Sequence, residues 1–388
     1  MPANPGRDVG ARIATIRRAR RMTQDDLARA AFVSPSHVRK IEQGSRHPSD
    51  DTLDALAEAL AIDPAHLLAA SGRVDNRVRD ALPHLSAAIA AYDVPDDGPV
   101  RPLVDLRAEV AKATTWRLAA QYMKIARHLP DLLAELARAI QAHPEAAPLM
   151  TAALRTADAA AYKFGSHDLS ARMVELMRWS SSQTDDPLLH ATVAYVRTQT
   201  FFAAHAFRPG LRALEQALDR APAPIGAPAT AARGALHMRA AVIAGRAGDD
   251  AAAHAHLAEA GRFGDQVPED VYQGTAFGPD TVRIHKVSVA VSLGSDHATS
   301  ALDVAREWKP PADLPAERRS GFYIELARAQ LWAGLADDAF ESLEVARRIA
   351  PQHTREHPWA REDAAALRRL KRADAETLTS FAQWIGAV

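Results

Sequence analysis

The sequence predicts an all-α protein. Long segments carry apolar residues at three- and four-residue spacing, which is the period of an amphipathic helix. Runs of β-branched residues of the strand type are absent from the sequence, and glycine and proline fall between the periodic segments rather than inside them. At 388 residues, of which 47% are apolar, the chain is long enough for about two or three domains with a sizeable core.

Composition limits both the compartment and the chemistry. No run of about 18 uncharged apolar residues occurs, and the N-terminal stretch MPANPGRDVG lacks the apolar centre of a signal peptide. The chain contains no cysteine, so a disulfide framework, a thiolate zinc site and a cysteine nucleophile are excluded. We therefore expect a soluble, cytoplasmic protein with no membrane partner.

Charge is distributed unevenly along the chain. Up to Pro48 there are ten basic and four acidic residues, whereas Ser49 to Gly72 holds five acidic residues and no basic one. The net charge of the whole chain is only -1. Clustered Lys and Arg suit the neutralisation of phosphates, although a charge run is more often a solvated face. The local sequence has to decide between these two interpretations.

The first predicted helix spans about Val9 to Arg20. Its apolar residues Ile13 and Ile16 are expected to face inward. Most of its basic side chains are expected to face outward, namely those of Arg12, Arg17, Arg18 and Arg20.

A second helix and a corner follow. Thr23 is the predicted cap of the second helix, because its hydroxyl can accept a hydrogen bond from the free amides of the next turn. Leu27 and Ala28 supply the apolar face of that helix. Phe32 and Val33 then form the predicted corner.

The third helix has a clear beginning and end. Ser34 is its predicted cap, and Pro35 occupies the first helical position, where the missing N–H costs nothing. Val38 and Ile41 are expected to point into the core, and Gly44 to end the helix.

Two further helices complete the N-terminal module. Ser49 is the predicted cap of a fourth helix, and Pro64 the start of a short fifth one. The apolar face of the fourth helix consists of Leu53, Leu56, Ala57 and Leu60. We therefore predict a five-helix domain over residues 1–72.

A connecting segment over residues 73–102 is predicted next. It begins with a helix from Val74 to Ala91 and ends with the Pro-, Gly- and Asp-rich stretch YDVPDDGPVRP, Tyr92 to Pro102. The helix places Leu82, Leu85 and Ile89 on one face, so it is expected to dock rather than act as a free linker.

Residues 103–388 show a degenerate helical repeat. The clearest unit, YIELARAQLWAGLADDAFESLEVARRIAP, runs from Tyr323 to Pro351 and resembles the tetratricopeptide pattern of large and small residues. Small residues recur in weaker units about 40 residues apart, at Ala171, Gly210, Ala253, Thr299 and Ala339. Stacking of such units predicts a curved α-solenoid with a concave inner wall.

The inner-helix positions of these units are candidate ligand-binding residues. They are Lys163, Tyr195, Gln199, Phe202, Met238, Arg246, Arg328 and Trp332. The alternative is that half of these side chains only pack between repeats.

The N-terminal module resembles the helix-turn-helix domain of the phage-repressor (Cro/CI) type, the XRE family of transcriptional regulators. The matching stretches are MTQDDLA, VSPSHVRKIEQG, RHPSDDTLDALAEAL and IDPAHLL, and the resemblance runs from Gly10 to Leu68. The departure is at the corner, where the family usually has Leu-Gly and this chain has Ala31-Phe32. Glycine accommodates a left-handed backbone there. Either the corner is rearranged, or Phe32 packs outward against another domain or subunit.

The resemblance implies that the third helix lies in the major groove of double-stranded DNA. Ser36, Arg39 and Lys40 would then reach base edges, and His37 would do so depending on the docking angle. The positions that typically hold the phosphate backbone are Gln24, Ser34, Gln43 and Arg46. The alternative without DNA binding is a helical corner with a charged face, or a helix-turn-helix used for protein contacts.

A second resemblance concerns the stretch FGPDTVRIHKVSVAVSLG, Phe277 to Gly294. It is similar to a motif of actinobacterial regulators that join such a helix-turn-helix to tetratricopeptide-like repeats. We predict a turn at Phe-Gly-Pro, followed by a helix capped by Asp280 or Thr281. A ligand contact by this corner is the alternative.

Catalytic and metal sites are not supported by the sequence. HTREH, His353 to His357, matches a His-x-x-Glu-His signature, but Pro351 and Pro358 bracket it, whereas zinc chemistry needs both histidines on one rigid helix. His254 and His256 are two residues apart, which predicts rings on different sides of a helix. A phosphate-binding Gly-rich loop with Lys and a nucleophile elbow are both absent from the sequence. We expect neither an enzyme nor a cofactor or metal.

These observations and resemblances lead to one hypothesis of function. The chain is expected to be a bacterial transcription regulator that binds double-stranded DNA as a homodimer, because one recognition helix touches only a few base pairs. Its repeats would dimerise, sense a peptide or small-molecule effector, or both. The alternative is a scaffold whose repeats bind a protein partner, with indirect or no control of genes.

Overall fold

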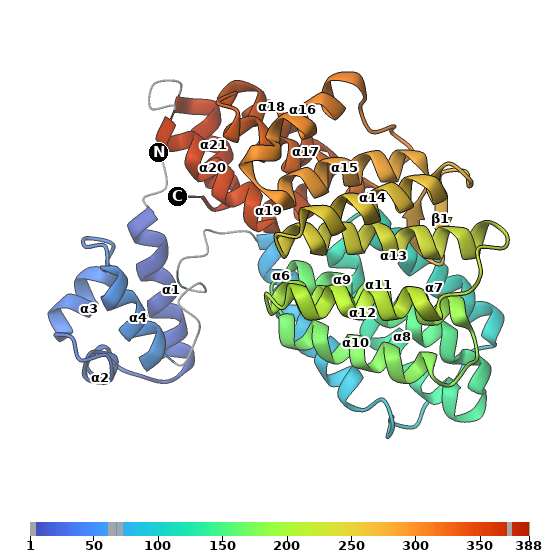
Figure 1. Cartoon of the computed structure of the whole chain (residues 1–388). Coiled ribbons are helices and arrows are strands. Elements are labelled where there is room, and N and C mark those ends of the chain that lie inside the picture. The colour runs from blue at the N-terminus through green and yellow to red at the C-terminus, as the bar shows by residue number, and fades with distance from the viewer. Residues whose placement is uncertain (1–4, 61–66, 68–72, 371–374, 388) are drawn as a thin grey trace. The chain divides into compact units, whose positions relative to one another are not determined.

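A computed structural model describes residues 5–60, 67, 73–370 and 375–387. The chain forms two compact units, residues 1–76 and 77–388. The first unit holds α1 (Pro5–Ala19), α2 (Gln24–Ala30), α3 (Pro35–Glu42) and α4 (Asp50–Ala59) (Figure 1). The fifth helix predicted at Pro64 lies outside the described residues.

The first unit packs α1 and α3 at very short distance. Ile13, Val38 and Ile41 are buried in its core together with residues of α2 and α4. A Cβ atom on Gly10 would lie 1.9 Å from the carbonyl oxygen of Ile41. Any side chain larger than that of glycine would therefore push α1 away from α3.

All three predicted helix caps of this unit are confirmed. The Thr23 hydroxyl accepts from the amide of Asp26, whose carboxylate accepts from the Thr23 amide in turn. Ser34 accepts from the amide of His37, and Ser49 accepts from that of Thr52. These bonds satisfy amides that the first turn of a helix leaves free.

Phe32 occupies a left-handed position, with φ of 54°. The amides of Phe32 and Val33 donate to the carbonyls of Arg29 and Ala28, which is the Schellman ending normally completed by glycine. The corner keeps its usual hydrogen bonds, and the Phe32 ring is 96% exposed. The corner is therefore not rearranged and the ring points outward, whereas its packing against another domain or subunit stays a prediction.

The second unit is almost entirely helical. Its helices are α6 (Arg73–Ala90), α7 (Leu103–Leu118), α8 (Tyr122–Ala142), α9 (Ala147–Lys163), α10 (His167–Ser181), α11 (Pro187–Ala203), α12 (Phe207–Arg220), α13 (Ala227–Arg246), α14 (Asp250–Gly264), α15 (Pro279–Leu293), α16 (Ala298–Glu307), α17 (Ala316–Trp332), α18 (Ala336–Ile349), α19 (Pro351–Glu356), α20 (Pro358–Leu370) and α21 (Ala375–Ile385). Short 3-10 helices occur at Pro144–Ala146 and Ser295–His297. Among the described residues no helix is both long and apolar enough to cross a membrane.

Successive helices from α9 to α18 form hairpin-like pairs (Figure 1). The first helices of neighbouring pairs contact one another, α11 with α13, α13 with α15 and α15 with α17. They form an inner layer, and α10, α12, α14, α16 and α18 lie outside it. The all-α fold and the helical solenoid are therefore confirmed, and the assignment to the tetratricopeptide family stays a prediction.

Small residues allow the pairs to approach closely. A Cβ atom on Gly210 of α12 would lie 2.4 Å from the Ile243 side chain of α13. Ala253 and Ala339 are fully buried, but Thr299 is exposed, and the buried small residues of α16 are Ala298, Ala301 and Ala305. The prediction that Thr299 is the buried small residue of the pair formed by α15 and α16 was therefore wrong.

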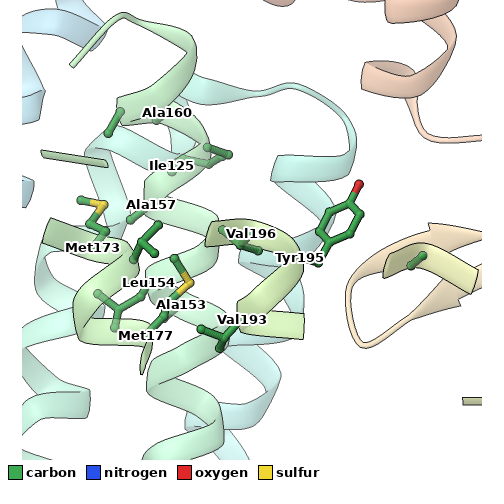
Figure 2. Packing of buried hydrophobic residues seen from close by; sticks show 14 of the residues in the cluster. Ile125, Ala153, Leu154, Ala157, Ala160, Met173, Met177, Val193, Tyr195 and Val196 are labelled. Atoms are coloured by element: carbon green, nitrogen blue, oxygen red, sulfur yellow. The ribbon is translucent and has the colours of Figure 1, made fainter. Parts of the chain in front are cut away.

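The main core of the second unit is built from alanine and larger apolar side chains in alternation. Figure 2 shows Met173 and Met177 of α10 beside Ala153, Leu154 and Ala157 of α9. Because alanine occupies little space, the flexible methionine side chains fill the gaps between the helices. This packing holds α10 against α9.

The predicted connecting segment is largely part of the second unit. The boundary falls between residues 76 and 77 rather than at 72 and 102, and Leu82, Leu85 and Ile89 of α6 are buried in the main core. The Pro-rich stretch that follows is also held, because Arg101 pairs with Glu135 of α8 at 2.7 Å. The expected docking of this helix is therefore observed.

A two-stranded hairpin is the exception to the helical fold. β1 (Asp270–Tyr272) pairs antiparallel with β2 (Thr275–Phe277). Gln273 and Gly274 both have positive φ, 47° and 72°, as a two-residue type I′ turn requires. The Phe277 ring seats the hairpin on α13, where a Cβ atom on Gly234 would lie 1.9 Å from the ring.

The cap predicted for the next helix was wrong. Neither Asp280 nor Thr281 caps α15. The Glu269 carboxylate accepts from the amide and hydroxyl of Thr281 instead. Burial raises the pKa of Glu269, while its hydrogen bonds with Thr281 oppose that shift. A residue before the hairpin therefore provides the cap that local sequence assigned to the helix itself.

Candidate functional sites

One side of α3 presents polar and basic side chains. Ser36, Arg39 and Lys40 are exposed, whereas Val38 and Ile41 of the same helix are fully buried. The Ser34 hydroxyl caps the helix and lies 3.2 Å from that of Ser36. The alternation follows from the helical period and leaves a donor-rich surface.

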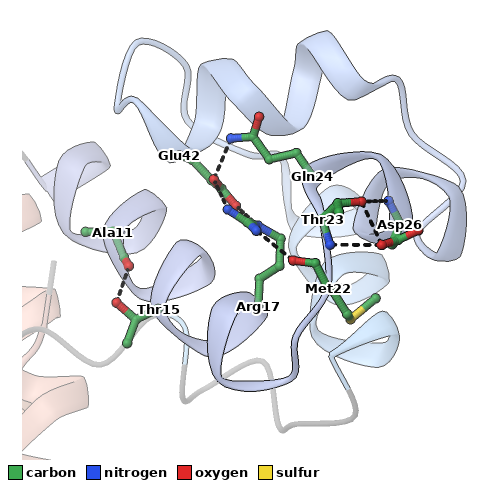
Figure 3. Close-up of polar contacts among 8 residues, drawn as sticks. All are labelled: Ala11, Thr15, Arg17, Met22, Thr23, Gln24, Asp26 and Glu42. Atoms are coloured by element: carbon green, nitrogen blue, oxygen red, sulfur yellow. Dashed lines mark hydrogen bonds and ion pairs between the residues drawn. The ribbon is translucent and has the colours of Figure 1, made fainter.

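An ion pair fixes α3 against α1 and α2 (Figure 3). Arg17 donates from Nε and Nη2 to the two carboxylate oxygens of Glu42, at 2.7 and 3.0 Å. Gln24 donates to the same carboxylate at 2.7 Å, and Arg17 Nη1 donates to the carbonyl of Met22. Burial of the Glu42 carboxylate would raise its pKa, but the hydrogen bonds from Arg17 and Gln24 outweigh burial and lower the pKa. The expectation that Arg17 faces outward was wrong, because this side chain is buried.

The predicted DNA-contacting residues do not all have the same accessibility. Six are exposed, namely Ser34, Ser36, Arg39, Lys40, Gln43 and Arg46. Gln24 and His37 are half-buried, and the Nε2 atom of His37 is buried without a hydrogen-bond partner in the described chain. Contact of these residues with DNA stays a prediction.

The inner layer of the second unit encloses a pocket of about 210 Å³. Basic side chains from several helices line it, and we call it the arginine pocket. These side chains are Arg117 of α7, Arg155 and Lys163 of α9, Arg239 of α13 and Arg318 of α17. The acidic side chains in its lining are Glu317 and Glu325.

Half of the predicted wall residues line this pocket. They are Lys163, Tyr195, Gln199 and Phe202. The placement of Met238 on the wall was wrong, because its side chain is fully buried in the core. Arg246 and Arg328 lie over the ring of Trp359 instead, at 4.2 and 4.6 Å from its centroid. Trp332 is 41% exposed and does not line the pocket.

The arginines were not found from the sequence, although α9 holds a signal for one of them. Arg155 stands in the stretch TAALRTADAAAYK, in which every residue from Ala153 to Ala161 is buried. A charged side chain surrounded on all sides by small residues has no solvated face available. Such a side chain has to find polar partners inside the protein.

Two arginines hold the hairpin at the edge of the pocket. Arg117 donates to the carbonyl of Gly274 at 2.6 Å. Arg155 donates to the carbonyl of Gln273 at 2.6 Å and to the hydroxyl of Thr275 at 2.7 Å. These partners are neutral, so neither of the two buried arginines is hydrogen-bonded to a carboxylate within the described residues.

Tyr195 is the point on which the charges converge. Arg239 lies over its ring at 4.5 Å from the centroid, Arg155 lies at 5.9 Å, and Arg318 donates to its hydroxyl at 2.7 Å. Figure 2 shows the ring turned away from the methionines of the core. Burial by itself would raise the pKa of this phenol, but the positive charges lower it to about 7.

The acids of the pocket have other partners. Glu317 pairs with Lys163 at 3.0 Å, and Lys163 together with other positive charges lowers the pKa of Glu317 despite burial. Glu325 accepts from Ser288, and burial raises its pKa to about 7. The field in the pocket is therefore positive.

The histidines of HTREH lie at one end of the pocket. His353 Nδ1 lies 2.7 Å from the Ser320 hydroxyl, and its Nε2 lies 3.0 Å from Lys163 Nζ. Burial and the charge of Lys163 lower the pKa of His353 to about 3. In the described part of the chain no group of three or more potential ligands is arranged to hold a metal ion.

The two histidines of the other motif, His254 and His256, differ in their exposure. His254 is exposed and pairs with Asp250. His256 is half-buried, and its Nδ1 lies 3.0 Å from that of His237. Burial and the neighbouring His256 lower the pKa of His237 to about 4. The predicted separation of the two rings is observed, and the partner of His256 comes from α13.

Comparisons with solved structures give distant likenesses. Residues covering 66% of this chain and 94% of the other align with Bacillus thuringiensis PlcR, solved in complex with the peptide PapR7 and DNA, at 17% identity and a TM-score of 0.29. Apo ComR from Streptococcus vestibularis aligns over 94% of this chain and 99% of its own at 13% identity, with a TM-score of 0.33.

Comparisons of sequence concern the first unit. A stretch of 54 residues is 46% identical to the immunity repressor protein of Bacillus phage phi105, which covers 14% of this chain and 38% of that repressor. The chain thus matches well under half of the length of this relative. Residues 8–70 match the family described as a helix-turn-helix domain. The first unit is therefore a helix-turn-helix domain, with α2 and α3 as its two central helices.

Proposed function

We propose that this protein is a DNA-binding transcriptional regulator in which α3 enters the major groove. The observation that carries the proposal is the exposed face of Ser36, Arg39 and Lys40 on a helix held rigidly by the Arg17–Glu42 pair. Arginine and lysine in this position can donate to guanine edges, and serine can donate to or accept from several bases. Arg46 and Gln43 next to the helix would hold phosphates.

Electrophoretic mobility of the promoter of its own gene tests this proposal. The intact protein is expected to shift that DNA, and the affinity should fall strongly with salt, because phosphate contacts release counterions. Arg39→Ala combined with Lys40→Ala should weaken binding by about 100-fold, from about 1–3 kcal/mol for each base contact.

A matched pair of substitutions controls for charge. Arg212 and Arg348 are exposed on α12 and α18 of the second unit. Arg212→Ala with Arg348→Ala therefore removes the same number of positive charges, but from the second unit instead of α3. This variant should bind DNA like the intact protein. Equal losses in both variants, or no shift by the intact protein, would overturn the proposal and favour a protein-interaction scaffold.

The regulator is proposed to act as a homodimer. A single recognition helix covers only a few base pairs, and pairing two half-sites about one DNA turn apart supplies the missing specificity. Sedimentation of the free protein and of its DNA complex measures the stoichiometry. One protein chain for each bound DNA site would contradict this part.

The second unit is proposed to sense an effector through the arginine pocket. Support comes from its position on the inner layer, where seven described helices and the hairpin contribute residues to the lining of one pocket. A ligand that touches several stacked helices can shift their relative positions. Whether the effector is a peptide or a small molecule follows from the chemistry of the pocket.

A further inference from the structure

Within the described residues, the arginines that line the arginine pocket make no hydrogen bond or ion pair to a carboxylate. Buried charges in proteins are normally paired with an opposite charge. Here the hydrogen bonds of Arg117 and Arg155 go to carbonyls and a hydroxyl, and those of Arg318 go to the Tyr195 hydroxyl and to Nε2 of His285. Lys163 already takes the carboxylate of Glu317.

Arg239 is the least satisfied of these side chains. Its contacts within the described residues are with aromatic rings, those of Tyr195 and Phe202 at 4.5 and 5.7 Å. Its Nε atom is buried and has no hydrogen-bond partner, and the same holds for Nε of Arg117, a residue that is only 8% exposed. Stacking orients the guanidinium plane of Arg239 and leaves its N–H groups to donate to something else.

Two further residues that line the pocket carry a buried polar atom without a hydrogen-bond partner in the described chain, namely Gln199 and His357. The side-chain oxygen of Gln199, which lines the pocket, is buried without a donor. Unpaired polar atoms of both kinds in one pocket are costly in the free protein. A ligand that carries both an anionic group and an N–H or O–H donor would satisfy them together.

We propose that the arginine pocket binds a small organic anion, whose carboxylate or phosphate group is held by Arg239 and by the charges of Arg155 and Arg318 around Tyr195. Guanidinium groups bind both kinds of oxyanion in bidentate geometry. The rings of Tyr195 and Phe202 provide the apolar wall for the rest of the ligand. The regulatory consequence rests on the proposed function, but binding itself is measurable without DNA.

Titration calorimetry of the full-length chain tests the proposal. Inorganic phosphate and pyrophosphate probe one source of the anion, and citrate probes the other. At least one of the three is expected to bind saturably, with an affinity that falls as salt rises. Absence of saturable binding by all three at millimolar concentration would overturn the proposal.

Substitutions locate the site. Arg239→Gln removes the charge and is expected to weaken binding tenfold or more, whereas Arg239→Lys keeps the charge and should lose less. Arg212→Gln removes a charge from the exposed face of α12 and should leave the affinity unchanged. Equal affinity of the intact protein and Arg239→Gln would show that the anion binds elsewhere and would overturn the site.

A measurement on the unsubstituted protein guards against misfolding of the variants. Phenylglyoxal modifies accessible arginines, and peptide mass mapping reports each one. The bound anion should protect Arg239 and leave the modification of Arg212 unchanged. Equal protection of both, or of neither, would contradict the proposal. Loss of the DNA mobility shift with intact anion binding would instead refute only the proposed function.

Discussion

Each unit holds an arginine that is wholly or partly buried, but the charge of the two side chains is compensated differently. In the first unit Arg17 makes two hydrogen bonds to the Glu42 carboxylate, and their side chains are only 10% and 5% exposed. In the second unit Arg239 stacks on Tyr195 and has no carboxylate in contact within the described residues. A compensated buried arginine holds elements together, whereas an uncompensated one is available to an incoming anion.

The largest expected effect is the loss of the compensating acid. Glu42→Ala leaves Arg17 buried without its partner, which should destabilise the first unit by about 3 kcal/mol. Amide hydrogen exchange of α2 and α3 measures this, because the tryptophans all lie in the second unit and report on that unit separately. Glu58→Ala, at an exposed position of α4, is the control. Similar losses in both variants would mean that the Arg17–Glu42 pair is not important for stability.

The second effect concerns the proton of Tyr195. Its pKa of about 7 lies below the ordinary value near 10, so between these limits the folded chain holds fewer protons than the unfolded one. Stability of the second unit should therefore rise as the pH increases from about 7 to about 10, by at most about 1.4 kcal/mol for each pH unit. Urea unfolding followed by tryptophan fluorescence measures this slope.

Tyr195→Phe is the matched control for that titration. The variant should lose both the pH slope and the tyrosine that ionises near neutral pH in ultraviolet absorbance. A bound anion should raise the pKa of Tyr195 by offsetting the charges around it. If no tyrosine of the intact protein ionises below the ordinary range, the positive field in the pocket is weaker than its geometry indicates.

A smaller effect is expected at the corner of the helix-turn-helix. Phe32→Gly removes the cost of a left-handed backbone at an aromatic residue, which should stabilise the first unit by about 1 kcal/mol after the greater freedom of glycine in the unfolded chain is included. Phe32→Ala removes the exposed ring but keeps the Cβ atom, so it should not give this gain. Hydrogen exchange of α2 compares the two. A gain with alanine as large as that with glycine would show that the backbone is not strained.

The smallest effect sharpens the contrast with Glu42. Without ligand, Arg239→Gln should change the stability of the second unit by less than about 1 kcal/mol, because the lost ring contacts are offset by relief of charge repulsion. Urea unfolding followed by tryptophan fluorescence is again the measurement. A loss as large as that of Glu42→Ala would mean that Arg239 is compensated by the protein itself, and this result would weaken the case for an anion.

The helix-turn-helix could be predicted from the sequence almost residue by residue. The sequence predicts Thr23, Ser34 and Ser49 as caps and Val38 and Ile41 as core residues, and the structure has them in these roles. The inward position of Arg17 was missed, because its partner Glu42 lies 25 residues away on another helix. Helical period alone assigns a charged residue to the outside.

The second unit was predicted in outline. Helical pairs and an inner wall followed from the spacing of small residues, and Tyr195 and Gln199 were placed on that wall. The hairpin at Asp270 to Phe277 was not predicted, because three-residue strands carry too little alternation to be detected. The role of Glu269 as the cap of α15 was also missed, because it depends on the hairpin, which brings Glu269 close to Thr281.

The sequence by itself determined the all-α fold, the N-terminal caps of α2, α3 and α4 and the face that α3 exposes. These features depend on hydrogen bonds and side-chain spacing within about one or two helical turns. Only the tertiary structure decided that Arg155, Arg239 and Arg318 meet at Tyr195. They come from different helices, and a charge is felt across space rather than along the chain. The local sequence pattern therefore does not indicate whether the charge of an arginine is neutralised in the fold.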